Sequence, residues 1–221
     1  GATLGMVCTR GFRDVLEIRR GDRAEMYNLF WQQPEPLVPR HRRLQIDERV
    51  RGDGTLLRPL DRDAVPALVA QLQADGVDSV AVAFLNAYAN PANELAMEAA
   101  LREAGFAGAI SLSHRVSGEY REYERFSTTA IDGFVRQRMA NYLSRLAAGL
   151  RELGFAGQCL IARSGAGSMT FSEAEERPFE TIMSGPVGGA QGGSELAKAL
   201  DIGALITADV GGTSFDTALV L

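Results

Sequence analysis

Residues 61–113 alternate between two amphipathic helical patterns and two short apolar runs. The run DSVAVAFL, residues 78–85, is apolar at nearly every position, which is typical of a strand buried on both faces of a parallel sheet. The helical pattern after it has Asn90 as its expected cap, Pro91 at its first position and Gly105 after its end. Strand, helix and strand in short succession predict a βαβ unit, and therefore an α/β fold.

The flanking segments extend this pattern. LGMVCT, residues 4–9, is predicted to be a buried strand, and residues 42–60 a hairpin around the turn Asp53-Gly54. Asp61 or Asp63 is the expected cap of the helix that follows.

Residues 116–155 carry a long helical pattern. Thr128 or Thr129 is a candidate cap for a new segment within it. From Ile131 onward, apolar residues recur every three or four positions, which predicts a stripe that faces a core.

Charge and composition restrict the kinds of partner. A net charge of −5 argues against nucleic acid, and no apolar run reaches the ~18 residues of a membrane span. Cys8 and Cys159 lie in apolar surroundings, where we expect buried strand residues with free thiols, and hence a cytoplasmic location. The cysteines show no zinc-ligand spacing with His41 or His114.

The stretch TADVGGTSFDTALVL, residues 207–221, places a Gly-Gly-Thr-Ser turn between two strand-like runs. Glycine permits positive φ and lets a ligand approach the backbone, and successive N–H groups in such a turn bind anions. Asp209 at the strand end would repel a bare phosphate, so its presence favours an intervening Mg²⁺. A plain structural hairpin is the alternative.

A second glycine cluster, SGPVGGAQGG at residues 184–193, begins a predicted helix. The exposed N–H groups and the dipole of a helix N-terminus favour anions. Close packing of this helix is the alternative, but two glycine-rich anion candidates within thirty residues favour a phosphate site.

The sequence resembles the hydantoinase A and 5-oxoprolinase family, which includes N-methylhydantoinase A-like subunits of the actin-like ATPase superfold. The resemblance covers nearly the whole chain through TRGFRDVLEIRR, PEPLVPR, SLSHRVSGEYREYERFSTTAIDGFV, SGPVGGAQGG and ADVGGTSFDTALV. It implies an α/β fold with parts of two actin-like (ribonuclease H-like) ATPase domains, in which helices flank mixed sheets.

The resemblance also implies a domain organisation and an activity. Residues 1–112 would be the rear of the N-terminal domain, and residues 113–221 the opening of the hydantoinase A domain. A first phosphate clamp and a C-terminal remainder would lie outside this chain, so we expect the chain alone to bind nucleotide weakly and to turn over nothing. The whole protein would be an ATP- and Mg²⁺-dependent hydrolase of cyclic amides or imides that works with a B-type hydantoinase subunit.

Site roles follow from the same resemblance. The catalytic candidates are Asp209, which is also the metal ligand, and His114 within the polar segment SHRVSGEYREYER. The nucleotide-binding candidates are Gly211, Gly212, Thr213, Ser214, Asp216, Ser184, Gly185, Gly188 and Gly189. A capping or surface role is the alternative for His114.

Two departures from the family pattern stand out. Ser164-Gly165-Ala166-Gly167 replaces Ser-Asn-Gly-Gly, which removes an amide, and Asp132 stands where asparagine is typical. Two alternatives also stay open: the ATP-using subunit of an acetone- or acetophenone-type carboxylase, and a non-catalytic nucleotide-binding module.

Overall fold

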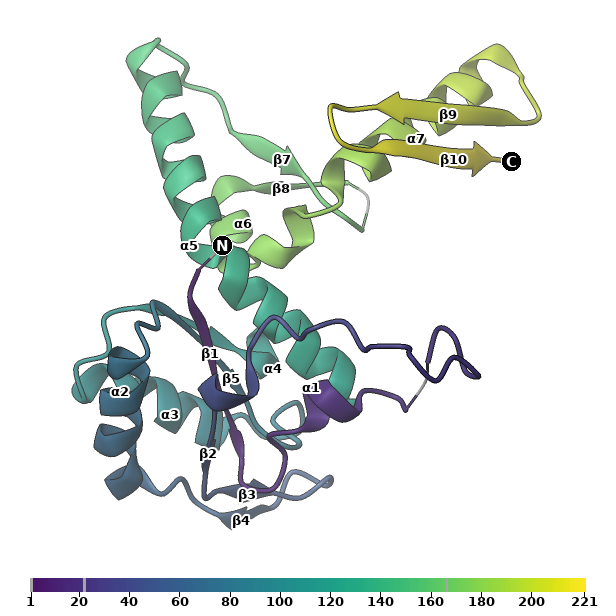
Figure 1. Cartoon of the computed structure of the whole chain (residues 1–221). Coiled ribbons are helices and arrows are strands. Elements are labelled where there is room, and N and C mark those ends of the chain that lie inside the picture. The colour runs from purple at the N-terminus through teal and green to yellow at the C-terminus, as the bar shows by residue number, and fades with distance from the viewer. Residues whose placement is uncertain (1, 22, 166) are drawn as a thin grey trace. The chain divides into compact units, whose positions relative to one another are not determined.

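A computed structural model of the chain describes residues 2–21, 23–165 and 167–221 (Figure 1). Contacts divide the chain into two compact units, Gly1–Arg138 and Met139–Leu221, so the division falls inside the long helix α5 (Glu122–Glu152). The expected domain boundary at residues 112 and 113 is a different division and stays a prediction.

The first unit contains a four-stranded sheet, a separate two-stranded pair and several helices. Its strands are β1 (Leu4–Thr9), β2 (Arg43–Ile46), β3 (Arg49–Val50), β4 (Leu56–Arg58), β5 (Ser79–Ala83) and β6 (Ala109–Leu112). Its helices are α1 (Val15–Ile18), α2 (Val65–Ala74), α3 (Ala92–Glu103), α4 (Ser113–Val116) and the first part of α5, with 3₁₀ turns at Arg40–Arg42 and Arg62–Ala64.

The four-stranded sheet has the order β2-β1-β5-β6, and all its strand pairs are parallel. Val7 of β1 aligns with Leu44 on one side and with Val82 on the other. Every residue of β1 and β5 is buried, because helices cover both faces. The predicted βαβ unit is therefore confirmed.

Two apolar clusters form on the two faces of this sheet. On one face, Val7, Val80 and Val82 pack with residues of α2 and α3, including Leu72, Met97 and Leu101. On the other face, Met6, Cys8 and Ala81 pack with Leu16 of α1 and with Phe126 and Ala130 of α5. Gly133 allows α5 to approach closely, since a Cβ there would lie 2.8 Å from Leu4 Cδ1.

The hairpin predicted over residues 42–60 is only partly correct. β3 and β4 form an antiparallel pair around Asp53-Gly54, but β2 pairs in parallel with β1. Arg43 is the first residue of β2 and is 2% exposed. Its burial is tolerated because its guanidinium donates to the Val38 carbonyl at 2.8 Å and pairs with Glu17 at 2.6 Å. Because this first residue of β2 is a charged arginine, the apolar pattern that would have distinguished β2 from β3 is weak in the sequence.

Two capping predictions are wrong for local reasons. The N-cap of α2 is Ala64, without a side-chain bond, so neither Asp61 nor Asp63 caps it. Thr128 and Thr129 do not begin a new helix, because their hydroxyls donate to the carbonyls of Glu124 and Arg125 inside α5. Asn90 accepts from the Ala92 backbone N–H at 3.0 Å, but the N-cap of α3 is Pro91, one residue later than predicted.

The second unit contains the rest of α5 and two antiparallel hairpins. Its elements are β7 (Leu160–Ala162), β8 (Ser168–Thr170), α6 (Phe171–Glu176), a 3₁₀ turn at Pro178–Thr181, α7 (Ser184–Leu200), β9 (Leu205–Val210) and β10 (Phe215–Val220). Its buried apolar cluster comprises Leu143, Met169 and Ala174. The predicted core-facing stripe of α5 is therefore only partly buried, and Tyr142 is 56% exposed.

Helix α7 packs along the β9–β10 hairpin, as Figure 1 shows. The packing is close at Gly193, where a Cβ would lie 2.5 Å from Thr207 Cγ2. The face of the hairpin toward α7 carries the partly buried residues Leu205, Thr207, Asp216, Ala218 and Val220. This packing brings the start of α7 beside the strands that flank the Gly-Gly turn.

The two cysteines differ in environment. Both are free; Cys8 is buried in β1, whereas Cys159 is only partly buried and precedes β7, so the prediction of a buried strand residue is wrong there. Burial of the Cys8 thiol raises its pKa to about 12. We expect iodoacetamide at about pH 8 to label Cys159 and to spare Cys8 until the chain unfolds, as mass spectrometry would read out. Rapid labelling of Cys8 in the folded protein would contradict this packing.

Candidate functional site

A cavity of about 440 Å³ lies between the start of α7 and the β9–β10 hairpin, within the second unit. It is lined by Met183, Pro186, Gly189, Thr207, Ala208, Asp209, Asp216, Thr217 and Ala218. Three of these residues, Gly189, Asp209 and Asp216, are sequence-predicted site residues. The structure thus brings Gly189 of the second glycine cluster to one cavity with the two acids of the hairpin. The other predicted site residues, Ser184, Gly185, Gly188 and the turn residues Gly211, Gly212, Thr213 and Ser214, do not line this cavity.

Two carboxylates face each other across this hairpin. Asp209 of β9 is directly opposite Asp216 of β10, so their side chains lie on the same face. Like charges in directly opposed positions destabilise a strand pair, and a cation between them would remove this cost. Mg²⁺ binds to one or two carboxylates and keeps its other positions for water and phosphate oxygens, so the two side chains fit this ion.

All four residues of the turn between the strands, residues 211–214, are exposed. It closes through a bond from the Gly211 N–H to the Ser214 carbonyl at 2.9 Å. The Ser214 hydroxyl donates to the Asp216 carboxylate at 3.2 Å, so it orients this acid.

Positive φ and ligand access are the two reasons expected for the glycines of this turn, and the first of them is wrong. Neither Gly211 nor Gly212 has positive φ. A Cβ at Gly212 would meet nothing within 4 Å, and one at Gly211 would meet only Ser214, at 3.6 Å. Contacts within the described residues do not demand glycine here, and ligand access is a physical reason that would.

The N-terminus of α7 has no side-chain cap. Its N-cap residue is Met183, and the Ser184 hydroxyl donates instead to the Thr181 carbonyl at 2.8 Å. Gly185, Gly188 and Gly189 follow, and a Cβ at any of them would lie in open space. Pro186 of the first turn has no N–H, and the Val187 N–H donates to the Met183 carbonyl at 3.3 Å, so the donors that this turn can offer an anion are the N–H groups of Ser184 and Gly185.

The segment before α7 is held in place by Glu180 and Ser164. The Glu180 carboxylate pairs with Arg163 and, at 2.8 Å, with Arg177. The Ser164 hydroxyl donates to the Glu180 carbonyl at 2.6 Å and accepts from the Met183 N–H at 3.1 Å. Ser164 thus positions the start of α7, while Ala166 of the same loop lies outside the described residues.

His114, the other catalytic candidate, lies in the first unit and belongs to a buried polar network. Its Nδ1 is 2.7 Å from the carboxylate of Glu94, which is 0% exposed, and its backbone N–H donates to the same carboxylate at 3.0 Å. Glu94 also accepts from the Phe84 N–H and from the Ser113 hydroxyl. The Arg125 guanidinium donates to Ser113 and to the carbonyls of Glu119 and Phe84, and its burial lowers its pKa.

Sequence reasoning missed several parts of these sites. Met183, Pro186 and Thr207 line the cavity but have no chemical signature in the sequence, because their positions depend on how α7 packs on the hairpin. Glu94 looks like an ordinary helix glutamate; its place beside the ends of β5 and β6 buries it. Among the described residues, no group of three or more His, Cys, Asp or Glu side chains could hold a metal, and no helix could span a membrane.

Two family models match the chain in sequence order. The model of the hydantoinase/oxoprolinase N-terminal region matches residues 1–105, and the hydantoinase/oxoprolinase model matches residues 125–221. Together they account for most of the chain, including both glycine-rich segments and the strands of the hairpin.

Curated relatives and a solved structure agree with these models. The chain is 34% identical to caprolactamase subunit alpha from Pseudomonas jessenii and 32% identical to the acetophenone carboxylase gamma subunit from Aromatoleum aromaticum. The alignments cover 99% and 100% of this chain and 32% of each relative, so the chain spans about a third of their length.

The crystal structure of ATP-dependent caprolactamase from Pseudomonas jessenii superposes with a TM-score of 0.85 at 34% identity, over 99% of this chain and 32% of that one. The predicted α/β fold of the actin-like (ribonuclease H-like) ATPase type is confirmed. Within the described residues, each sheet is purely parallel or purely antiparallel. The agreement of sequence motifs, family models and fold shows that this chain belongs to the hydantoinase/oxoprolinase family.

Proposed function

We propose that the intact protein is an ATP-dependent hydrolase that opens a small cyclic amide or imide, and that the cavity beside Asp209 holds the phosphates of the nucleotide. The observation that carries this proposal is the convergence of two opposed carboxylates and an uncapped, glycine-rich helix N-terminus on one cavity. A cation and an anion are needed together to satisfy these two features, and Mg-ATP supplies both.

Each segment has a distinct part in this proposal. The first-turn N–H groups of α7 bind phosphate oxygens, and Gly185, Gly188 and Gly189 let those oxygens approach the backbone. Asp209 holds hydrated Mg²⁺, while Asp216, oriented by Ser214, binds one of the ion's waters. Gly211, Gly212 and Thr213 form the exposed turn that contacts the phosphates. Mg-ATP would supply the phosphoryl group that, once on the amide oxygen, activates the carbonyl carbon toward attack.

The relatives support both the nucleotide and a partner chain. One of them is named as a subunit of caprolactamase and another as a subunit of acetophenone carboxylase, and the solved caprolactamase is described as ATP-dependent. By analogy, we propose that this protein works together with a second subunit, of the B type that the sequence resemblance implies. The free thiols of Cys8 and Cys159 favour a cytoplasmic location. The catalytic role of His114 remains part of the proposal, with Glu94 fixing its ring through Nδ1.

The test is ATP-dependent turnover by the intact protein together with its partner subunit. Hydantoin, 5-oxoproline and caprolactam are supplied with Mg-ATP, and ring opening is measured alongside ADP release. Ring opening that requires both ATP and Mg²⁺ is the expected result. ATP hydrolysis without ring opening of any of the three would contradict the assignment as a cyclic amide hydrolase.

A carboxylase subunit is the second candidate, favoured by the 32% identity to the acetophenone carboxylase gamma subunit. Bicarbonate distinguishes the two reactions, because only carboxylation consumes it. Bicarbonate-dependent release of ADP from ATP in the presence of acetophenone would support the carboxylase. Nucleotide binding without any turnover would indicate a non-catalytic module.

A further inference from the structure

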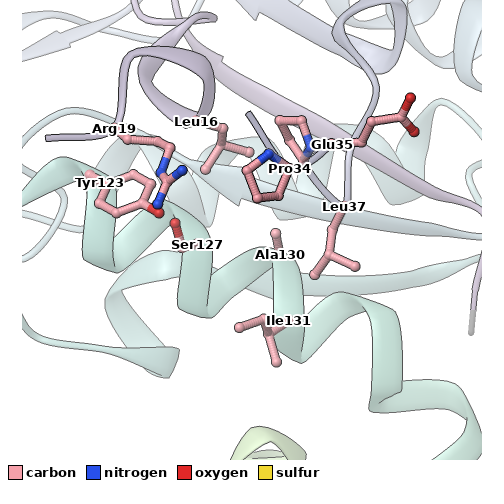
Figure 2. A pocket seen from close by; sticks show the side chains of 10 residues that line it. Leu16, Arg19, Pro34, Glu35, Leu37, Tyr123, Ser127, Ala130 and Ile131 are labelled. Atoms are coloured by element: carbon pink, nitrogen blue, oxygen red, sulfur yellow. The ribbon is translucent and has the colours of Figure 1, made fainter. Parts of the chain in front are cut away.

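A second cavity, of about 220 Å³, lies in the first unit and has no part in the proposed nucleotide site. It is bounded by the end of α1, the loop 34–37 and one face of α5 (Figure 2). α5 contributes Tyr123, Ser127 and Ala130, which recur at helical spacing and therefore share one face. Its volume is about seven times that of one water in the liquid, so it suits a small molecule.

Three polar groups converge at one wall of this cavity. Figure 2 shows the guanidinium of Arg19 directed toward the hydroxyl groups of Tyr123 and Ser127. None of these three side chains has a hydrogen-bond or ion-pair partner among residues 2–21, 23–165 and 167–221. The apolar part of the lining comprises Leu16, Pro34, Pro36, Leu37, Ala130 and Ile131, and Glu35 is the remaining lining residue. A few convergent polar groups in an otherwise apolar cavity are typical of a small-molecule site.

Three arginines near Arg19 each pair with a carboxylate, whereas Arg19 pairs with none in the described part of the chain. Arg20 pairs with Glu124 at 2.5 Å, Arg40 with Asp14 at 2.8 Å, and Arg43 with Glu17 at 2.6 Å. The nearby carboxylates are therefore engaged elsewhere. Figure 2 also shows the Glu35 carboxylate pointing away from Arg19.

The backbone at Arg19 gives a second reason to regard its position as specific. Arg19 has φ 56 and ψ −130, an unfavourable conformation for a residue with a Cβ. Such strain persists where the surrounding structure imposes it, and it concentrates at binding sites. Here the conformation ends α1 and places the Arg19 side chain at the cavity wall.

We propose that this cavity binds a small organic carboxylate with an apolar body. Arg19 receives the carboxylate through paired N–H donors, which match the two oxygens in geometry as well as in charge. The hydroxyls of Tyr123 and Ser127 donate to the same oxygens. The apolar body lies against Leu16, Ala130 and Ile131, where it replaces water.

Calorimetry on the intact protein tests this with cyclopentanecarboxylate as the probe and cyclopentanecarboxamide as its uncharged match. The carboxylate is expected to bind with a Kd below about 10 mM. The amide is expected to bind at least about tenfold more weakly, because it lacks the charge that Arg19 complements.

Arg19→Gln should weaken carboxylate binding by about the same factor, whereas Arg145→Gln, the loss of an exposed arginine on α5, should not. Ser127→Ala keeps the charge of Arg19 and the helix, and it should weaken carboxylate binding by a few fold. It serves as the second variant if Arg19→Gln fails to fold. Equal affinity for the two probes would overturn the proposal. Absence of saturable carboxylate binding would also overturn it.

Discussion

Replacing Asp209 with asparagine is expected to lower Mg-ATP-dependent turnover by the intact protein at least about a hundredfold. Asparagine preserves size and strand pairing opposite Asp216 but removes the charge that holds the metal ion. The loss should appear in both ADP release and ring opening, and raising the Mg²⁺ concentration should recover part of it. Steady-state kinetics across a Mg²⁺ titration is the measurement.

The matched control for this variant is Asp201→Asn. Asp201 ends α7 in the same unit, outside the lining of the cavity, with φ 53, a conformation that asparagine tolerates well. The Asp201→Asn variant also loses one negative charge from the second unit, and its turnover should match that of the wild type. If Asp209→Asn also retained wild-type turnover at every Mg²⁺ concentration, the metal role of Asp209 would be wrong.

Replacing Glu94 with alanine is expected to lower the free energy of unfolding by about 4 kcal/mol. The Glu94 carboxylate is fully buried, and it accepts from two backbone N–H groups, the Ser113 hydroxyl and the His114 ring. Alanine leaves these donors buried without an acceptor, and it removes the negative charge near the buried Arg125. Urea denaturation followed by circular dichroism would measure the loss.

Glu98→Ala is the comparison for Glu94→Ala, because both residues lie in α3, one helical turn apart. Glu98 forms a surface pair with Arg115 at 2.9 Å, in which the two side chains are 30% and 53% exposed. Such a pair contributes at most about 1 kcal/mol. Losses for the two variants within about 0.5 kcal/mol of each other would show that burial does not distinguish these two glutamates.

Much of the first unit could be predicted from periodicity alone. Residues 4–9 and 79–83 are strands because an apolar run without helical spacing fits a sheet covered on both faces. β2 could not be predicted correctly, since its partner is set by parallel pairing with β1 and its first residue is a buried arginine. Arg43 is stabilised there by Glu17 and the Val38 carbonyl, and neither partner is adjacent to it in sequence.

The candidate site could likewise be predicted only in part from the sequence. The sequence predicts the Asp209–Asp216 hairpin, because a short turn between two strand-like runs places opposed residues on one face. It does not predict that Met183 and Pro186 line the cavity, which depends on the close approach of α7 at Gly193. Likewise, Glu94 and Glu98 are equivalent in the helical pattern, and only the tertiary fold buries the first of them.

The central claim is that nucleotide phosphates lie against the glycine-rich start of α7, and two glycines of this helix test it. A Cβ at either Gly189 or Gly192 would meet nothing within 4 Å, but only Gly189 lines the cavity. Leucine at either position should therefore be accommodated by the helix, while only Gly189→Leu would fill the space that the phosphates need.

Mg-ATP calorimetry on the intact protein compares the wild type with these two variants. The account predicts that Gly189→Leu loses measurable binding and that Gly192→Leu binds like the wild type. Equal affinity in all three proteins would contradict it.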